Sequence, residues 1–568
     1  MAARETKSSS AIRVLPIVGW IRTYDRSWLT PDAIAALSVW ALLVPQGLAY
    51  ATLAGVPVQY GLYTAFAALL AYAIFGTSRQ VVQGPSGTVA AISSAVIAPL
   101  VGASALGTTK AVPYAAALAI LSGLIYLVLG VLKAGWVSNF LSKAVLAGFI
   151  LGFAIGIIID QSYKLLGVPK TSGTYAQKLV ETIKEIPQTN GATLVVGATG
   201  LITLLLMRRY LPRWPRALIV MAISIVAVGA LDLAADGVAI TGPVPTGLFT
   251  VGLPNVSWSD FAALFAGALS VVFVGYSESL ASGREMAARH KYEIEPNQEL
   301  IAQGAAQIGA GFVGGFVTDG SLSKTGVADT AGQRSQLASI INAVMILLTM
   351  LFLASLFEDL PSAILGAVVI DSMVGLIDVQ KFKRYFRTNR ADWACYMAAM
   401  LGMLFFGITQ GILFGVVLSL LLLIARSSRP GLRTLAHDPR DDTYLDPSRH
   451  EGLEEVPGVL IIRIDGPLFF ADATPFLEQV RGLVDAAAEA PKAVVLDAEA
   501  VSQTDSDGAD ILRQLHDELD GRGVALYVAR PEATIVDVWS RSGAIDALGA
   551  DHVLETTRQA VAAAKGGD

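Results

Sequence analysis

Long apolar segments separated by short polar loops recur between residues 31 and 428. A helix needs roughly 20 residues to cross the hydrocarbon core of a bilayer, and about fourteen runs here are long enough to cross it fully or in part. The uninterrupted runs include 112–132, 145–159, 217–231, 337–357 and 412–425. Others are short or broken by Gly and Pro. The pattern predicts an all-α polytopic membrane domain over residues 31–428, preceded by an N-terminal segment at 1–30.

The pattern changes after residue 428, where prolines and charged residues replace the apolar runs. We interpret residues 429–455 as a linker. From 456 to 568, short β-rich runs alternate with helical segments, which is typical of a small α/β domain. The predicted strands are 458–464, 493–496 and 524–528, and the predicted helices are 474–489, 508–519 and 535–540.

Composition supports a membrane protein and excludes several other classes. Apolar residues make up 54% of the chain and charged residues only 15%, which is not the composition of a soluble enzyme. The net charge of −6 comes without a long basic run, so a nucleic-acid partner has no electrostatic support. The single cysteine and five scattered histidines show neither disulfide nor metal-ligand spacing. We therefore expect no enzymatic activity, no metal site and no cofactor.

Basic loop residues predict the orientation of the chain, because they concentrate on the cytoplasmic side. The N-terminus lacks the apolar centre and cleavage site of a signal peptide, so the first span is expected to direct insertion. Basic residues follow each even-numbered run, namely Arg79, Lys133, Arg208, Arg284, Arg334, Lys381 and Arg426. This pattern predicts a multi-pass protein of the inner or plasma membrane with both termini cytoplasmic. The mixed segment 170–185 is predicted to be a short interfacial helix.

Two ionisable residues, Glu278 and Lys324, lie within or between apolar runs. Charges at such depth are costly and usually mark a substrate or ion pathway. Glu278 is therefore a candidate proton carrier, and Lys324 a candidate to offset the charge of an anion. The simpler interpretation is that the two residues satisfy each other, or neighbouring hydroxyls, for helix packing.

Similar motifs recur in the two halves of this region, at about 31–235 and 258–428. Pro45–Ala49 is followed roughly forty residues later by Gly84–Ala90, and Ser277–Ala281 by Gly320–Thr325 at a similar interval. About seven spans per half would give the two halves opposite orientations, an inverted repeat. In such folds, short interrupted helices point their N-termini at an anionic substrate.

Three further motifs have competing interpretations. Gln46 and Tyr50 lie one helical turn apart and either face the pocket or are simply packed. The stretch 309–314 reads G-x-G-x-x-G, but it lies in an apolar run without the strand that a dinucleotide site requires, so we interpret it as helix packing. The acidic loop 501–508 is interpreted mainly as a connection between a strand and a helix, and it can cap the helix that begins near Gly508. A regulatory surface is the alternative.

The chain resembles the SulP family of sulfate permeases over nearly its whole length. The resemblance rests on residues 45–50, 54–63, 75–79 with Gly84-Pro85, 321–325 and the terminal domain, which resembles a STAS domain. It implies fourteen membrane segments in two inverted repeats of seven, a core domain moving against a gate domain, and homodimers. The implied anion-site residues are Gln46, Tyr50, Ser86, Gly87, Thr88, Ser321, Leu322, Ser323, Lys324 and Thr325, with Glu278 as the acid of the eighth helix.

Two positions depart from the family pattern. Many relatives carry arginine where this chain has Lys324, and a lysine lacks the bidentate fork of a guanidinium. In the STAS domain, Asp507 replaces the serine that related proteins phosphorylate. Phosphorylation at that position is therefore not expected.

We accordingly expect a secondary active transporter of a small anion, of the sulfate or bicarbonate class or a dicarboxylate, coupled to protons and working by an elevator-type motion. Sodium symport is the alternative, with Glu278 and Ser282, four residues apart on one helix, as ligands. An uncoupled anion channel and a sensor that only positions the STAS domain are the remaining alternatives.

Overall fold

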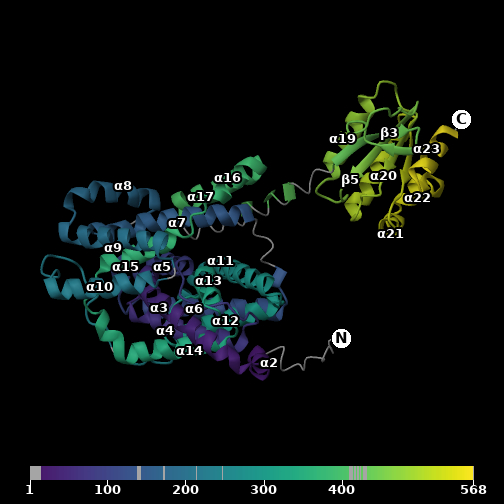
Figure 1. Ribbon diagram of the computed structural model, residues 1–568. Coiled ribbons are helices and arrows are strands. Elements are labelled where there is room, and N and C mark those ends of the chain that lie inside the picture. The colour runs from purple at the N-terminus through teal and green to yellow at the C-terminus, as the bar shows by residue number, and fades with distance from the viewer. Residues whose placement is uncertain are drawn as a thin grey trace. The chain divides into compact units, whose positions relative to one another are not determined.

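The computed structural model describes residues 15–136, 143–169, 173–212, 214–245, 247–407 and 431–566, and a few positions between 408 and 430. It divides into two compact units, Met1–Ser419 and Leu420–Asp568 (Figure 1). The first unit is helical and contains the predicted membrane spans. The second is an α/β domain.

The helices of the first unit follow the predicted apolar runs closely. In the first half they are α2 (Pro16–Arg22), α3 (Leu29–Ala54), α4 (Gln59–Phe75), α5 (Gly87–Val101), α6 (Val112–Val131), α7 (Lys143–Leu166), α8 (Tyr175–Glu185), α9 (Gly191–Tyr210) and α10 (Arg216–Leu231). In the second half they are α11 (Trp258–His290), α12 (Pro296–Phe312), α13 (Leu322–Thr330), α14 (Leu337–Leu348), α15 (Ser362–Val374), α16 (Val379–Thr388) and α17 (Arg390–Phe406). Helix α14 continues through a wider and then a tighter turn to Phe357.

Some predicted features fall outside the described residues. These are most of the run 412–425, the basic residue Arg426 and residues 170–172 at the start of the predicted interfacial helix. The rest of that segment forms α8, which begins with a capping box between Thr174 and Gln177. Such a box satisfies two backbone N–H groups at the start of the helix.

The membrane helices pack into two bundles. In the first, α12 lies against α4 and α6, α14 against α3 and α4, and α11 against α5 and α6. In the second, α15 and α17 lie against α7, and α9 against α15. We refer to these as the core bundle and the gate bundle. Helix α3 of the core bundle contacts α10 and α15 of the gate bundle.

Glycines allow the closest helix contacts in the core bundle. A Cβ atom placed on Gly311 would lie 2.5 Å from Cγ1 of Ile120, and one on Gly304 would lie 2.9 Å from the carbonyl oxygen of Gly123. Gly311 belongs to the G-x-G-x-x-G stretch at the end of α12. Gly311 thus lies where α12 approaches α6, and a Cβ atom on Gly309 would lie 3.7 Å from the carbonyl oxygen of Ala67 on α4, as expected for packing between membrane helices.

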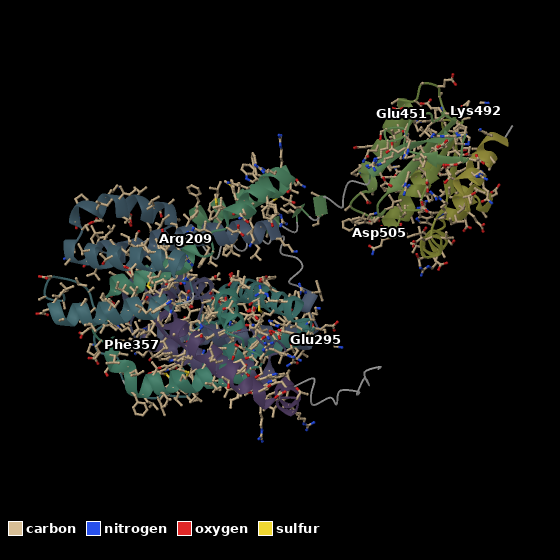
Figure 2. All side chains as sticks on the ribbon, in the orientation of Figure 1. Arg209, Glu295, Phe357, Glu451, Lys492 and Asp505 are labelled. Carbon is tan, nitrogen blue, oxygen red and sulfur yellow. The ribbon has the colours of Figure 1, made fainter. Side chains whose placement is uncertain are left out.

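Large apolar side chains remain uncovered on the outer surface of the first unit. Val226, Phe352 and Phe406 are each about two-thirds or more exposed, and carbon predominates among the side chains along the outer helices in Figure 2. Among the described residues, seven helices are long and apolar enough to span a bilayer, with shorter apolar helices at α4, α5 and α10. These surfaces are suited to contact with lipid.

The second unit is built on a six-stranded sheet with the order β4-β3-β5-β6-β7-β8. Its strands are β3 (Gly431–Asp438), β4 (Thr443–Leu445), β5 (Val459–Asp465), β6 (Ala493–Asp497), β7 (Ala525–Ala529) and β8 (Val553–Leu554). Strands β5 to β8 are parallel, and β3 is antiparallel to both β4 and β5. Its helices are α19 (Ala473–Asp485), α20 (Ser506–Asp520), α21 (Ala533–Arg541), α22 (Ala544–Leu548) and α23 (Thr557–Gly566). Separate hydrophobic clusters cover the two faces of the sheet.

The structure differs from the sequence interpretation at residues 429–455. That stretch was expected to be a linker, but it contains β3 and β4, and β3 pairs with β5 over Gly431–Leu435. The charged residues and prolines of this stretch belong to two short strands at one side of the sheet, with β4 at the edge and β3 next to it. Polar residues are common in such edge strands. Helix α20 also begins two residues earlier than expected, because Asp505 caps it by accepting a hydrogen bond from the N–H of Gly508 (2.8 Å).

Candidate functional site

Two short helices meet N-terminus to N-terminus inside the core bundle. The residues just before α5 and α13 form a two-residue antiparallel ladder, in which β1 (Gln83–Gly84) pairs with β2 (Asp319–Gly320). Neither Ser86 nor Ser321, the residues that precede these helices, caps the helix with its side chain. The first backbone N–H groups of both helices and their dipoles are thus available to an anion.

Hydroxyl groups at the start of α5 hydrogen bond to two carboxyl groups. Ser86 Oγ donates to Asp319 Oδ2 (2.7 Å), and Thr88 Oγ1 donates to Glu278 Oε1 (3.0 Å). Asp319 is fully buried and Glu278 is partly buried on α11, and the charge of each carboxyl group acts on the other. Two neighbouring carboxylates repel each other unless a proton or a cation offsets their charge.

Lys324 supplies a positive charge beside these carboxyl groups. Its side chain is fully buried, and Nζ donates to the carbonyl oxygen of Pro85 (2.5 Å), which links α13 to the segment before α5. The charges of Asp319 and Glu278 act on it electrostatically, with that of Asp319 the stronger. The ammonium group therefore links the two short helices α5 and α13, which we call the half-helices, and it offsets part of the negative charge.

The other predicted residues of α13 face different directions. Ser321 and Ser323 pair through their hydroxyl oxygens (3.0 Å), and Leu322 and Ser323 are exposed. Thr325 is fully buried, and its Oγ1 accepts a hydrogen bond from the N–H of Val82 (3.0 Å). The two serines are accessible to a ligand, whereas Thr325 supports the segment leading to α5.

Gln46 and Tyr50 connect this region to the gate bundle. Both are nearly buried on α3, and Gln46 Nε2 donates to Ser372 Oγ on α15 (3.5 Å). A Cβ atom on Gly87 would lie 3.4 Å from the ring of Tyr50 and 2.5 Å from Cε of Met373. Tyr50 thus packs against the start of α5, and α15 closes the same region from the gate side.

Ser282, the second residue of the alternative sodium site, lies one turn beyond Glu278 on α11. Its side chain is fully buried, and its Oγ makes no hydrogen bond within the described part of the chain. The structure therefore places both candidate ligands on one helix.

Sequence reasoning overlooked Asp319. The residue lies in the stretch F-V-T-D-G-S, only two positions before Ser321. Like Glu278, Asp319 is an acid at membrane depth, where a charge is costly and usually marks a substrate or ion pathway. The available signal was therefore the presence of a second acid next to the predicted anion site.

A buried amide cluster behind the ladder was also not predicted. Gln83 Nε2 donates to Gln303 Oε1 (2.7 Å) and to Thr318 Oγ1 (2.9 Å). Gln307 binds both the N–H (3.1 Å) and the carbonyl oxygen (2.8 Å) of Thr318. Gln307 thereby satisfies the backbone groups of Thr318, which lies outside a helix, as the interior of a membrane protein requires.

Comparison with known proteins decides the family. The sequence profile described as the sulfate permease family matches residues 29–399, and that of the STAS domain matches residues 452–564. The chain belongs to the sulfate permease family. It is 33% identical over 548 residues to a probable sulfate transporter of Mycobacterium tuberculosis strain CDC 1551 / Oshkosh, covering 96% of this chain and 97% of that protein. It is 29% identical to high affinity sulfate transporter 2 of Stylosanthes hamata, covering 97% and 86%.

Solved structures share the fold of this sulfate permease. The murine solute carrier 26 family member A9 anion transporter, in its inward-facing state, matches with a TM-score of 0.90 and 26% identity, covering 99% of this chain and 96% of that one. The transmembrane domain of the cyanobacterial bicarbonate transporter BicA matches with a TM-score of 0.60 and 20% identity, covering 70% and 98%, and supports the fold alone. The predicted fold, two inverted repeats followed by a STAS domain, is confirmed. The chain is a multi-pass membrane anion transporter and not an enzyme.

Proposed function

We propose that this sulfate permease carries sulfate together with protons, with bicarbonate as the second candidate substrate and dicarboxylates as the third. The observation that supports this best is the opposed, uncapped N-termini of α5 and α13 beside Glu278. The anion would bind the free backbone N–H groups and the hydroxyls of Ser321 and Ser323. Relatives named as sulfate transporters place sulfate first among the candidates.

Glu278 couples the proton in this proposal. It accepts a hydrogen bond from Thr88 at the start of α5, so it lies next to the proposed anion position. A bound anion repels an ionised carboxylate, whereas a protonated carboxyl group can remain beside it. Anion and proton would therefore bind together, and an inward proton gradient would drive anion uptake.

Movement of the core bundle against the gate bundle would carry the site across the membrane. Gln46 and Ser372 bridge the two bundles through a hydrogen bond of 3.5 Å, at the long end of the normal range. The half-helices, the ladder and Lys324 all belong to the core bundle and would move as a unit. We propose an elevator-type motion in which α3 slides along α15, in a homodimer with both termini in the cytoplasm.

The test is uptake of labelled sulfate, bicarbonate and fumarate into proteoliposomes under imposed proton or sodium gradients. We expect an inward proton gradient to raise sulfate uptake by the wild type, and Glu278→Gln to abolish this stimulation. Thr88→Val, which removes the hydroxyl bound to Glu278 but not the carboxyl group, is the matched control and should retain part of it. Undiminished proton-driven uptake by Glu278→Gln would refute the coupling role.

Sodium symport remains the second candidate, because Ser282 places an unsatisfied buried oxygen one turn from Glu278. Hard cations such as sodium bind oxygen ligands, which favours this site. Lys324 already supplies positive charge nearby, however, and this places sodium coupling second to proton coupling. Stimulation by a sodium gradient that Ser282→Ala removes would favour this candidate over proton coupling. Large anion currents that respond to neither gradient would instead indicate a channel.

A further inference from the structure

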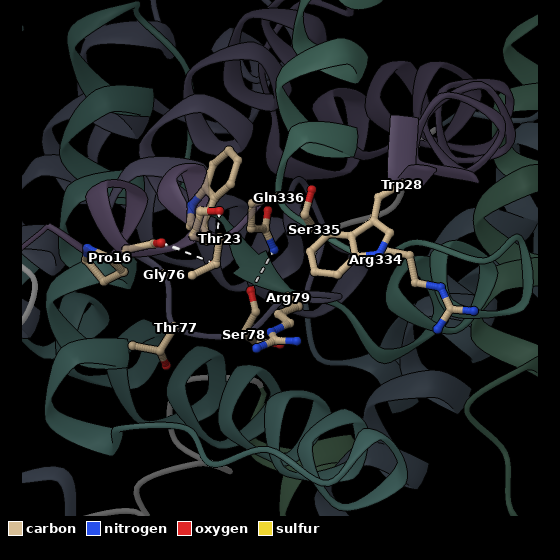
Figure 3. Close-up of a pocket in the computed structure, with 12 residues that line it drawn as sticks. Pro16, Thr23, Trp28, Gly76, Thr77, Ser78, Arg79, Arg334, Ser335 and Gln336 are labelled. Carbon is tan, nitrogen blue, oxygen red and sulfur yellow. Dashed lines mark hydrogen bonds between the residues drawn. The ribbon is translucent and has the colours of Figure 1, made fainter. Parts of the chain in front are cut away.

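A cavity of about 330 Å³ lies at one end of the core bundle, away from the anion site. It is bordered by α2, by the segment that follows α4 and by the segment that precedes α14. In Figure 3, Pro16 and Thr23 lie on one side of it, Trp28 and Arg334 on the other, and Gln336 between them.

The surrounding helices place this cavity at the membrane surface. Helix α3 begins at Leu29, α4 ends at Phe75 and α14 begins at Leu337, so three spans of the core bundle end beside it. Helix α2 buries none of its residues, and Ile21 on it is 54% exposed. Trp20 Nε1 donates to the carbonyl oxygen of Ala73 on α4 (3.1 Å). A short helix with uncovered apolar side chains and tryptophan is typical of the lipid headgroup region.

Two of the residues that line the cavity are arginines without an acidic ion-pair partner in the described part of the chain. Arg79 and Arg334 line it, and neither guanidinium forms an ion pair with an acid among the described residues. Arg79 lies over the ring of Tyr292, 5.5 Å from its centroid. Asp32, the acid bound by the same loop, already accepts from the N–H of Arg334 (2.7 Å) and from both the N–H (3.1 Å) and Oγ (2.6 Å) of Ser335. Guanidinium groups bind phosphate oxygens in a fork geometry.

Gln336, one of the residues that line the cavity, has an acceptor without a donor. Gln336 is 2% exposed, and its Nε2 donates to the carbonyl oxygens of Ser78 and Val81 (both 2.9 Å). Its Oε1 receives no hydrogen bond within the described structure. A buried acceptor without a donor is costly, so a ligand hydroxyl at this position would be favoured.

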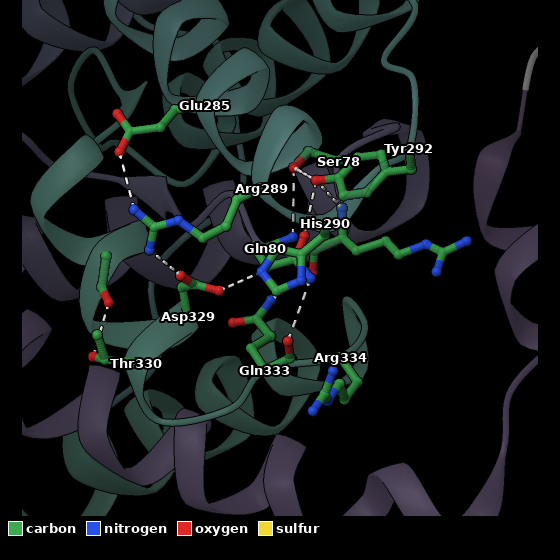
Figure 4. Close-up of polar contacts among 12 residues, drawn as sticks. Ser78, Gln80, Glu285, Arg289, His290, Tyr292, Asp329, Thr330, Gln333 and Arg334 are labelled. Atoms are coloured by element: carbon green, nitrogen blue, oxygen red, sulfur yellow. Dashed lines mark hydrogen bonds and ion pairs between the residues drawn. The ribbon is translucent and has the colours of Figure 1, made fainter.

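A network of hydrogen bonds holds the loops of the cavity in place. The hydroxyl of Tyr292 lies 2.8 Å from Ser78 Oγ and donates to Gln80 Oε1 (2.8 Å), and Gln333 Nε2 donates to the carbonyl oxygen of Arg79 (2.8 Å), as Figure 4 shows. The backbone at Arg79 is therefore fixed to the segment before α14. A preorganised site loses less entropy when its ligand binds.

We propose that this cavity binds the headgroup of an anionic phospholipid. The phosphate would bind Arg79 and Arg334, a headgroup hydroxyl would donate to Gln336 Oε1, and the acyl chains would lie along the apolar side chains of α2. Phosphatidylglycerol has the required phosphate and hydroxyls, whereas phosphatidylcholine has no hydroxyl donor in its headgroup. The bound lipid would tie α2 to the core bundle.

The experiment is native mass spectrometry of the full chain with added phosphatidylglycerol or phosphatidylcholine. We expect the wild type to retain one phosphatidylglycerol per protomer in preference to phosphatidylcholine. Arg79→Gln/Arg334→Gln should weaken this binding by about tenfold or more, since a hydrogen bond to a charged group contributes about 1.5–3 kcal/mol. Arg22→Gln/Arg26→Gln is the matched control, because these arginines lie nearby but do not line the cavity, and it should bind as the wild type does.

The remaining outcomes each overturn the inference. Equal loss of lipid in both double variants would show general attraction to the basic surface instead of a site. Thermal stabilisation by inorganic phosphate, equal to that by phosphatidylglycerol and lost in Arg79→Gln/Arg334→Gln, would show a site for a free oxyanion. Binding is measured without transport, so this result is independent of the proposed proton-coupled uptake.

Discussion

Asp319 gives the anion site a second carboxyl group, and its removal should change the affinity for substrate. We expect Asp319→Asn to lower the KM for sulfate, because one negative charge beside the binding position is lost. The decrease should be about tenfold, since a unit charge at roughly 10 Å and an effective dielectric constant of ~20 contributes about 1.7 kcal/mol. Initial rates of labelled sulfate uptake at a fixed proton gradient measure it.

The asparagine keeps an oxygen that can accept from Ser86 Oγ, so the substitution isolates the charge from the hydrogen bond. Ser86→Ala, which removes the hydrogen bond and leaves the charge, serves as the control and should not lower the KM. An unchanged KM in Asp319→Asn would mean that the Asp319 carboxyl already carries a proton when sulfate binds.

At the scale of single residues, the chemical roles of side chains could be predicted from the sequence, but their contacts could not. Glu278 and Lys324 were recognisable because charges at membrane depth are rare and costly. Two contacts depend on the ladder between segments more than two hundred residues apart. Lys324 donates to the carbonyl oxygen of Pro85, and Thr325 accepts from the N–H of Val82. Such a long-range pairing leaves no local signal in one sequence.

The contact between α3 and α4 depends on the absence of a side chain at Gly61. A Cβ atom there would lie 1.9 Å from the carbonyl oxygen of Gly47, a distance that backbone movement must relieve. Overpacking typically costs about 1–3 kcal/mol, so we expect Gly61→Ala to lower the melting temperature in detergent by about 1–6 °C. Fluorescence-detected size-exclusion chromatography after heating measures the change.

Gly326 offers the control for this substitution. It lies within α13, and a Cβ atom on it would meet nothing within 4 Å. Alanine favours a helix over glycine by about 1 kcal/mol, so Gly326→Ala should leave the melting temperature unchanged or raise it. A similar loss of stability in both variants would show that any change of glycine is harmful, and would contradict the packing argument.

At the scale of elements, hydrophobicity predicted the long helices, and interruptions by Gly, Pro and Ser predicted the short ones. Helices α5 and α13 begin at Gly87 and Leu322, within the motifs that suggested an inverted repeat. Strands β3 and β4 were missed because edge strands carry charges that resemble a linker. Hydrophobicity therefore predicts a helix or strand best where the whole element lies in a single environment, here the lipid.

At the scale of the whole molecule, the proposed transport machinery belongs to one of the two units. The half-helices, Glu278, Asp319 and Lys324 all lie before Ser419, and the STAS domain has its own sheet and its own hydrophobic clusters. No residue of the proposed anion site comes from the second unit. The STAS domain is therefore expected to modulate uptake instead of taking part in it.

Deleting residues 431–568 and, separately, replacing Lys324 with Ala tests this division. We expect the truncated protein to retain measurable proton-driven sulfate uptake in proteoliposomes, because its anion site is complete. Lys324→Ala should lose that uptake in the full chain, because the buried Asp319 and the partly buried Glu278 then lack their compensating charge and repel the anion. The reverse result, with uptake lost on truncation and kept in Lys324→Ala, would support a sensor in which the membrane unit only positions the STAS domain. Size-exclusion profiles matching the wild type are required of both proteins, so that a loss of uptake reports on the site and not on folding.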